Sequence, residues 1–298
     1  MLLSMIAPLL LAAAQGPQPS SPDDDPPTPA EVEELAFDRD RYERMTVPVT
    51  IAGRGPYRFM VDTGSQATVV TPRIVEDLAL QPDGQALVVG MGSSALVSTL
   101  TLDGLEFANR RLDNLRTPLL LDSHIGADGI LGLDSLQDLR VLMDFREDRI
   151  LVADARDLGG NSGYEIVVRA RRKLGQMIIT DARIGNIRVN VLIDTGTQRS
   201  FGNRALRERL RTSEHGTEIM TDVHGSAIEN ELRLARRLSI GGITLARLPI
   251  GFADSPTFAA LGLENQPALV LGIGDLRAFR RVAIDFNQRR ILFDLPGR

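Results

Sequence analysis

A short motif that occurs twice limits most strongly what this chain of 298 residues can fold into. The first copy reads Phe59-Met60-Val61-Asp62-Thr63-Gly64-Ser65, and the second reads Val191-Leu192-Ile193-Asp194-Thr195-Gly196-Thr197. In each copy an apolar run, typical of a buried strand, leads directly into Asp-Thr-Gly and a residue with a hydroxyl group. A motif that recurs within a longer repeat indicates two copies of one structural unit. We therefore predict two similar halves, each presenting one aspartate at the end of a strand.

Further landmarks follow each aspartate in the same order. Thr71-Pro72 and Asn203 are helix-start signals, and they predict short helices over residues 73–80 and 204–210. A glycine-containing turn, an apolar pair closed by glycine and a terminal strand pair come next in both halves. The turns are Gly90-Met91-Gly92-Ser93 and His224-Gly225-Ser226, the apolar pairs are Ile130-Leu131-Gly132 and Val270-Leu271-Gly272, and the strand pairs lie over 141–152 and 282–293.

Short runs of β-branched residues bounded by turn residues make up most of the remaining chain. Runs over 47–52 and 57–61, and over 178–184 and 188–193, predict two hairpins. A glycine-rich segment over 154–163 interrupts the pattern and reads as a linker. We expect a mainly β fold with two compact lobes, residues 45–158 and 159–298, each containing short helices.

The segment before residue 45 has a different character. Residues 2–14 are apolar and end in Ala12-Ala13-Ala14, which is typical of a signal-peptide cleavage site. The run is too short to cross a bilayer comfortably. Residues 16–29 are rich in Pro, Ser and Asp, and we expect a disordered spacer or pro-region over 15–44. We expect a signal peptide over 1–14, export to the periplasm or out of the cell, and no membrane span after its removal.

Composition excludes several classes of protein. The chain has no cysteine, which excludes disulfides, cysteine-bound zinc and a cysteine nucleophile. A net charge of -5, 4% aromatic residues and no Trp argue against nucleic acid as a partner. Three histidines, His124, His215 and His224, form no HExxH pair, and no serine lies in a GxSxG motif. We expect no metal and no cofactor.

The aspartates themselves suggest a chemistry. A carboxylate at the end of a buried strand is costly unless it is hydrogen-bonded or shares a proton. Gly64 and Gly196 allow tight turns whose N–H groups point back at the carboxylates, and the hydroxyls of Ser65 and Thr197 are predicted to donate to them. One such segment alone would favour an ordinary capped turn. Two carboxylates brought within about 3 Å would share a proton, which gives one base and one acid for activating a water molecule.

At these residues the sequence resembles the aspartic proteases, both the pepsin-like and the retropepsin-like enzymes. The resemblance runs from about Met45 to Asp294 and rests on the two Asp-Thr-Gly motifs and the two glycine-closed apolar pairs. It implies two pseudo-twofold-related acid-protease lobes, β-barrel-like, with the active-site cleft between them. It also implies a monomer whose halves form the equivalent of a dimer, and a polypeptide substrate bound in extended form.

The resemblance assigns roles to particular residues. The catalytic pair would be Asp62 and Asp194. Thr63 and Thr195 would hold the two loops together, and Gly132 and Gly272 would pack behind them. Each lobe is about as short as a retropepsin-like subunit, and the segment 88–97 lacks the tyrosine of a pepsin-like flap.

Two glycine-containing turns are candidate flaps over the site. Gly90, Met91, Gly92 and Ser93 lie in the first candidate, and His224 and Gly225 lie in the second, 220–228. Whether one or two flaps form stays open. For His224 a solvated loop position is favoured over contact with substrate.

Three other features receive structural interpretations. Asp134 and Asp275 are interpreted as helix N-caps, and the basic run 169–173 as a solvated hairpin face rather than a binding surface.

The sequence thus favours an aspartic endopeptidase. Two alternatives stay open: a peptide-binding module of the same fold without turnover, and a regulatory protease dedicated to one envelope substrate. Hydroxyl bonds from Ser65 and Thr197 would favour ionisation of the pair, so an optimum on the acidic side of neutral pH is expected.

Overall fold

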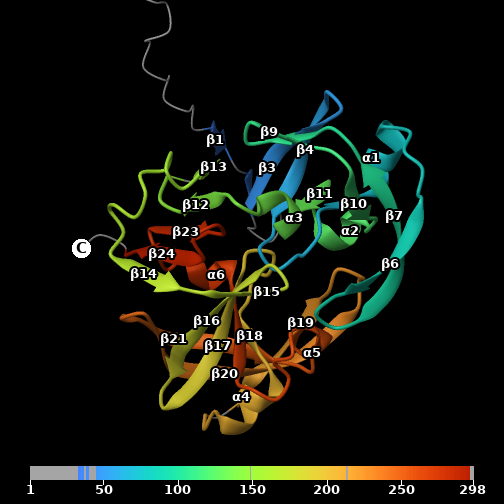
Figure 1. Ribbon diagram of the computed structural model, residues 1–298. Coiled ribbons are helices and arrows are strands. Elements are labelled where there is room, and N and C mark those ends of the chain that lie inside the picture. The colour runs from blue at the N-terminus through green and yellow to red at the C-terminus, as the bar shows by residue number, and fades with distance from the viewer. Residues whose placement is uncertain (1–32, 37, 40–44, 148, 213, 296–298) are drawn as a thin grey trace, which may run out of the picture. The chain divides into compact units, whose positions relative to one another are not determined.

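A computed structural model describes residues 33–36, 38–39, 45–147, 149–212 and 214–295. The predicted signal peptide and nearly all of the predicted spacer lie outside the described residues. The described residues all belong to one compact unit. That unit is mainly β with short helices, which confirms the predicted fold class (Figure 1). Among the described residues, no helix is long and apolar enough to cross a membrane.

The elements of the first half follow the predicted order. They are β1 (Glu33–Ala36), β2 (Asp38–Arg39), β3 (Met45–Ile51), β4 (Arg54–Val61), β5 (Val69–Val70), α1 (Pro72–Asp77), β6 (Gly84–Val89), β7 (Ser94–Leu102), β8 (Leu105–Phe107), β9 (Arg110–Leu112), β10 (Leu115–Pro118), α2 (Asp122–Ile125), β11 (Gly129–Leu131), α3 (Leu133–Leu136), β12 (Arg140–Asp144) and β13 (Arg149–Ala153). The predicted hairpin at the start of this half is β3–β4, and its terminal strand pair is β12–β13.

The second half repeats this order with longer strands. Its elements are β14 (Ile166–Arg169), β15 (Arg171–Lys173), β16 (Gln176–Ile184), β17 (Ile187–Asp194), β18 (Phe201–Gly202), α4 (Arg204–Arg209), β19 (Glu214–Thr221), β20 (Ala227–Ile240), β21 (Ile243–Phe252), α5 (Pro256–Ala260), β22 (Ala268–Gly272), α6 (Ile273–Leu276), β23 (Arg281–Asp285) and β24 (Arg290–Asp294). The predicted hairpin is β16–β17, and the terminal strand pair is β23–β24.

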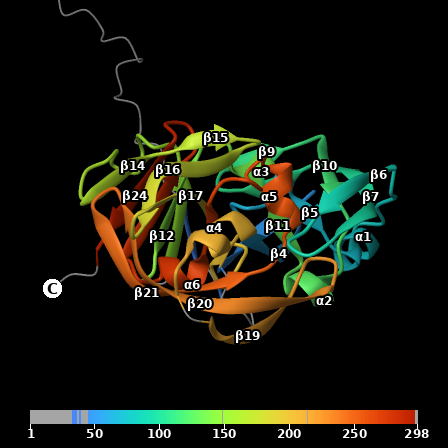
Figure 2. The same ribbon diagram turned by 90° about the horizontal axis from the view of Figure 1, so that it is seen from below.

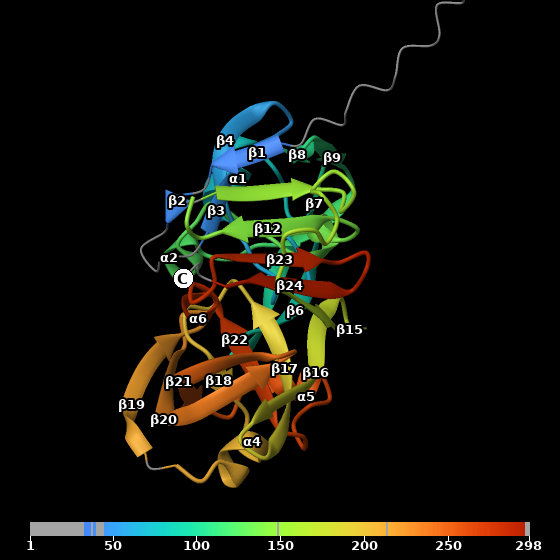
Figure 3. The same ribbon diagram turned by 90° about the vertical axis from the view of Figure 1, so that its left-hand side faces the viewer.

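A six-stranded sheet joins the two halves, in the order β1-β13-β12-β23-β24-β14 (Figure 3). Its central pair, β12 and β23, is antiparallel and comes from different halves, with Leu142 opposite Ala283. On either side of that pair the same three-strand arrangement follows, β12-β13-β1 and β23-β24-β14. The sheet therefore has the symmetry expected of a duplicated unit.

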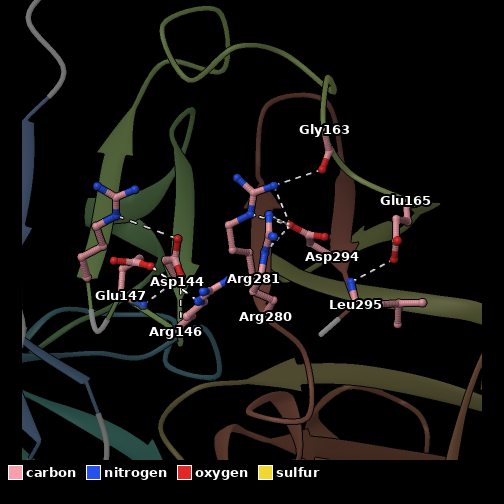
Figure 4. Close-up of polar contacts among 10 residues, drawn as sticks. Asp144, Arg146, Glu147, Gly163, Glu165, Arg280, Arg281, Asp294 and Leu295 are labelled. Carbon is pink, nitrogen blue, oxygen red and sulfur yellow. Dashed lines mark hydrogen bonds and ion pairs between the residues drawn. The ribbon is translucent and has the colours of Figure 1, made fainter. Parts of the chain in front are cut away.

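Charged residues stabilise the sheet that the two halves share. Arg140 and Asp285 form an ion pair at 2.7 Å between β12 and β23, and both side chains are fully buried. Where β23 begins and β24 ends, Asp294 accepts from Arg281 at 2.6 Å, and the Arg281 guanidinium also donates to the Gly163 carbonyl at 3.0 Å (Figure 4). The Arg140–Asp285 ion pair connects the two halves. The hydrogen bond from Arg281 to Gly163 attaches the segment between β13 and β14 to β23.

Each half also contains a matching pair of parallel strands that positions its aspartate. In the first half β4 runs parallel to β11, with Val61 beside Leu131. In the second half β17 runs parallel to β22, with Asp194 beside Gly272. On each of β4 and β17, the apolar side chains on the face opposite to the aspartate are buried in the main hydrophobic core. Both aspartates therefore stand at the end of a strand held on both sides.

The predicted helices form, with some corrections. The first helix, α1, ends at Asp77 rather than at residue 80, because Ala79 has a left-handed φ of 51°. Asn203 caps α4 by accepting from the N–H of Leu206, as predicted. The Thr71 side chain accepts no hydrogen bond from the N–H groups of α1, so it does not cap this helix as predicted, and its hydroxyl donates to the Asp128 carbonyl at 2.8 Å.

Candidate active site

The two Asp-Thr-Gly loops meet through their threonines. The N–H of Thr63 donates to the hydroxyl oxygen of Thr195 at 3.1 Å, and the N–H of Thr195 donates to that of Thr63 at 3.2 Å. Each hydroxyl in turn donates across the interface, from Thr63 to the Ile193 carbonyl at 2.9 Å and from Thr195 to the Val61 carbonyl at 2.6 Å. Both threonines are buried. Four reciprocal hydrogen bonds thus tie the end of β4 to the end of β17.

This arrangement brings Asp62 and Asp194 into direct contact. The two carboxyl groups are hydrogen-bonded to each other. A Cβ atom added to Gly64 would lie 2.4 Å from Asp194 Oδ2, and one added to Gly196 would lie 2.3 Å from Asp62 Oδ2. Since no real Cβ approaches an oxygen so closely, only glycine permits each loop to lie against the opposite carboxyl.

Backbone N–H groups of the loops point at the carboxylates. Asp62 Oδ1 accepts from the N–H of Gly64 at 2.7 Å and of Ser65 at 3.0 Å. Asp194 Oδ1 accepts from the N–H of Gly196 at 2.8 Å. Such donors stabilise a charged carboxylate without any cation.

The pKa of Asp194 is raised well above its ordinary value. Burial is the main cause, and the charge and hydrogen bond of Asp62 add to it, while the N–H groups of Gly196 and Thr197 oppose it. A proton therefore stays between the two carboxyls at pH values where a solvent-exposed aspartate has lost its proton.

The predicted hydroxyl donors do not act on the pair. Ser65 Oγ donates to the Ala67 carbonyl at 2.8 Å, and Thr197 Oγ1 donates to the Arg199 carbonyl at 3.2 Å. A hydroxyl has one proton to donate, so neither is left for the aspartates. The prediction was wrong because both hydroxyls close their own turn. The two hydroxyls therefore give no reason to expect an acidic pH optimum.

A second pair of matching contacts lies behind the loops. Asp134 accepts from Thr68 Oγ1 at 2.6 Å, and Thr68 Oγ1 accepts from the N–H of Gly132 at 3.2 Å. In the second half Asp275 accepts from Ser200 Oγ at 2.5 Å, and Ser200 Oγ accepts from the N–H of Gly272 at 3.1 Å.

These contacts correct one interpretation and locate two glycines. The N-cap residues of α3 and α6 are Gly132 and Gly272, so Asp134 and Asp275 are not the N-caps that the sequence predicted. A Cβ on Gly132 would lie 2.4 Å from the backbone of Ala67, and one on Gly272 would lie 2.7 Å from the Arg199 carbonyl. Both glycines therefore lie directly against the segments that follow the two Asp-Thr-Gly motifs.

Both candidate flaps form hairpins, β6–β7 and β19–β20, and their tips touch. Ser93 Oγ donates to Asp222 Oδ2 at 2.6 Å, and Ser226 Oγ lies 3.2 Å from Ser93 Oγ. His224 Nε2 lies 3.0 Å from the Val88 carbonyl oxygen. His224 is thus partly buried and bonded to the other hairpin, and the interpretation of a solvated loop histidine was wrong.

Each tip also reaches the opposite half (Figure 2). Gly90 accepts from Thr257 of α5 at 3.1 Å, and Met91 packs against an apolar cluster that contains Leu192. Val223 packs against a cluster that contains Met60. Because side chains alternate along a strand, Met60 and Leu192 share a face with Asp62 and Asp194 respectively. The tips therefore lie on the side of the strands to which the aspartates point.

Asp222 holds the tip of the second hairpin in shape. Its Oδ1 accepts from the N–H of His224 at 2.9 Å and of Ser226 at 2.8 Å. Burial by itself would raise its pKa, but the hydrogen bonds from Ser93, Ser226 and His224 outweigh burial, and the pKa of Asp222 is lowered. Asp222 is therefore a stable anion that links the two hairpins.

Sequence reasoning missed Asp222 and Gln176. The position of Asp222, two residues before His224-Gly225, is an Asx-turn signal that could have been noticed. Gln176 is buried, and its Nε2 donates to the Gly64 carbonyl at 2.7 Å, while its Oε1 has no partner among the described residues. No local pattern marks Gln176, because the contact joins two distant segments.

Other parts of the described structure offer no competing centre of this kind. Among the described residues, no group of three or more His, Asp or Glu side chains is placed to hold a metal ion. Two surface pockets of about 410 and 490 Å³ lie away from the aspartates, one beside Phe107 and the other beside Arg188.

Comparison with known proteins agrees with the duplicated geometry. A family model described as aspartyl protease matches residues 47–135 and 180–274, one match in each half. A search of curated proteins found no match. The two matched segments cover more than half of the chain and contain both Asp-Thr-Gly loops, so the chain belongs to the aspartyl protease family.

Proposed function

We propose that the protein is an aspartic endopeptidase in which Asp62 and Asp194 act as one catalytic pair. The observation that carries this proposal is the reciprocal bonding of Thr63 and Thr195, which sets the two carboxyls against each other across the halves of a single chain. Belonging to the aspartyl protease family supports peptide hydrolysis in general, and the paired carboxyls supply the means.

The raised pKa of Asp194 suggests how the work is divided. Asp194 begins as the protonated acid, and Asp62, held by the N–H groups of Gly64 and Ser65, begins as the base. Asp62 takes a proton from a water molecule while the water oxygen bonds to the peptide carbonyl carbon. Asp194 gives its proton to the carbonyl oxygen, which yields a neutral tetrahedral diol.

Breakdown of the diol restores the pair. The proton held by Asp62 passes to the peptide nitrogen, the C–N bond breaks, and one diol hydroxyl returns its proton to Asp194. The products are a carboxylic acid and an amine, and the pair ends in its starting protonation state. No group outside the two carboxyls and the water is needed for the proton transfers.

The hairpins suggest how the substrate is held. Their tips are bonded to each other by Ser93 and Asp222, on the side to which the aspartates point. A polypeptide in extended form would lie between the tips and the carboxyls, so the tips would separate for entry and close again over the bound chain.

The test is cleavage of an unbiased peptide library at several pH values. The wild-type protein is expected to cut, and Asp62→Asn and Asp194→Asn are each expected to lose at least about 1000-fold in kcat/KM. Asp157→Asn, an exposed change in the segment between the halves, serves as the matched control and should cut like wild type. A folded wild-type protein that binds library peptides without cutting any would contradict the proposal and favour a binding module.

A further inference from the structure

A basic pocket lies in the second half, away from the aspartates. It has a volume of about 490 Å³ and is lined by Arg171 of β15, Thr180 of β16, Arg188 and Asn190 of β17, Arg209 of α4, and Gln266 and Pro267 of the loop before β22. Three arginines from three elements thus line one pocket. No carboxylate lines the pocket, although the chain as a whole carries a net charge of -5.

The three arginines form no ion pairs within the described structure. Among the described residues, none of Arg171, Arg188 and Arg209 has an ion-pair partner, whereas Arg204 on the same helix as Arg209 pairs with Glu208 at 3.7 Å. All three side chains are exposed.

One of the three is held in a fixed orientation. Arg188 Nε donates to the Thr180 carbonyl at 2.8 Å, which leaves its two terminal nitrogens free for a ligand. Asn190 donates weakly to Gln266 Oε1 and to the Pro267 carbonyl, both at 3.4 Å, and so joins β17 to the loop that forms the far wall. A guanidinium held in this way loses less freedom when it binds a carboxylate in a bidentate manner.

The pocket is connected to the catalytic pair through one strand. Arg188, Asn190, Leu192 and Asp194 lie on the same face of β17, because side chains alternate along a strand. Arg188 lies six residues before Asp194, a separation of about 20 Å along the strand at about 3.3 Å per residue. A substrate segment several residues from the cut bond could therefore reach the pocket.

We propose that this pocket is a secondary binding site for acidic side chains of the polypeptide substrate. Three arginines in a lining that contains no carboxylate favour carboxylate ligands, and the volume suits one or two side chains rather than a folded domain. The site gives the enzyme a preference for substrates with an Asp- or Glu-rich segment beside the cut. This inference rests on the proposed endopeptidase function and deepens it by naming a substrate class.

The first test is direct binding, which does not depend on turnover. Asp194→Asn protein is titrated with a fluorescent peptide selected from the library by its binding to this same variant and extended by four Glu residues, and with the same peptide extended by four Gln residues. The Glu peptide is expected to bind about tenfold more tightly at low salt. Adding Arg188→Gln and Arg209→Gln should remove most of this difference.

The matched control separates the pocket from the overall charge. Arg169→Gln with Arg172→Gln removes the same two charges from the basic run without touching the pocket lining, and should leave most of the preference intact. An equal loss in both double variants, or no preference for the Glu peptide, would overturn the proposal. Competition by inorganic phosphate as effective as by the Glu peptide would also overturn it, because the site would then be specific for free phosphate.

A second test measures kcat/KM of wild type for the same two peptides placed beside a cleavable sequence. The expected result is a five- to tenfold preference for the Glu peptide, carried by KM rather than kcat. If wild type cuts neither peptide, the proposed function fails while the binding measurement still decides the pocket. If wild type cuts both equally and the binding difference is absent, the pocket proposal alone fails.

Discussion

At the scale of single residues, two buried threonines bring Asp62 and Asp194 together. Thr195 donates to the Val61 carbonyl and accepts from the N–H of Thr63, and both backbone partners are buried with it. A buried backbone group that loses its partner costs about 1–3 kcal/mol. The threonines therefore contribute to both stability and the geometry of the pair.

Replacing Thr195 by valine tests this. Thr195→Val keeps the shape but removes two hydrogen bonds between the halves, and it should lower the free energy of unfolding by about 2–4 kcal/mol. Thr195→Ser keeps the hydroxyl and should cost about 1 kcal/mol for the lost methyl group. Urea unfolding measures both free energies. A valine variant as stable as the serine variant would show that the two hydrogen bonds of the Thr195 hydroxyl contribute nothing to stability.

Asp194 makes stability depend on pH. Its pKa is raised in the folded protein, so the folded state binds the proton more tightly than the unfolded state. The resulting stability is present below the ordinary pKa of an aspartate and is lost as pH rises through the raised value. At neutral pH the charge shared by the two carboxyls therefore lowers the free energy of unfolding of wild type, and a neutral side chain at position 194 would remove this cost.

Asp194→Asn should consequently be more stable than wild type at neutral pH, by on the order of 1 kcal/mol or about 2–4 °C in Tm. The difference should shrink as pH falls. Thermal unfolding from acidic to neutral pH measures it, with Asp157→Asn as the exposed control that shows no such trend. A variant less stable than wild type at neutral pH would mean that the pair is not strained by its shared charge.

At the scale of elements, hairpins and helices were predictable where their signals are local. The turns of β3–β4 and β16–β17, and the cap of α4 by Asn203, follow from residues within a few positions of one another. The roles of Ser65 and Thr197 were not predictable in the same way, since a hydroxyl can close its own turn or reach a carboxylate, and sequence does not decide between them.

Contacts between distant segments were the other part that sequence did not reveal. The hydrogen bonds from Gln176 to Gly64 and from Ser93 to Asp222 join residues from opposite halves. Nothing in a local pattern specifies which turn a given side chain will face. The duplicated motif predicted that the two aspartates would meet, because symmetry relates them, but it did not predict the unsymmetrical contacts around them.

The hairpin tips supply a prediction at this scale. Asp222→Ala removes the acceptor for Ser93 and for two N–H groups of its own turn, so the tips should separate more often. Backbone amides over 88–95 and 220–227 are expected to exchange with solvent about tenfold faster. Thr221→Ala, on an exposed neighbouring position, is the control. Unchanged exchange at the first hairpin would show that Asp222 does not link the two.

The lowered pKa of Asp222 sets the pH range of this link. A lowered pKa stabilises the folded arrangement above the ordinary value for an aspartate, and the effect is lost only as pH falls through the lowered value. Exchange at the tips, corrected for the intrinsic rate, should therefore be constant from neutral to mildly acidic pH. A rise between pH 7 and 5 would contradict the assignment.

At the scale of the whole molecule, the six-stranded sheet makes the two halves depend on each other. Its central strands carry the buried ion pair of Arg140 with Asp285. The Arg140 guanidinium also donates to Asn161 at 3.0 Å. Removing one partner of a buried pair leaves an uncompensated charge and costs about 3–5 kcal/mol. Arg140→Met should therefore destabilise both halves together.

Restoring neutrality should restore stability. The double change Arg140→Met with Asp285→Leu is expected to recover most of the loss seen in Arg140→Met alone, because no unpaired charge remains.

Urea unfolding followed by circular dichroism and by tyrosine fluorescence should give one coincident transition for wild type. Two separate transitions would show that the halves unfold independently.

The central claim is that one catalytic site is formed by two aspartates from the two halves of the same chain. The most direct test is a double-mutant cycle in kcat/KM on a single peptide substrate, using Asp62→Asn, Asp194→Asn and the double variant. If the carboxyls act as one unit, each single change should cost at least about 1000-fold, and the double variant should be no worse than either single variant. A single variant that retains wild-type activity, or losses that multiply in the double variant, would contradict a shared pair.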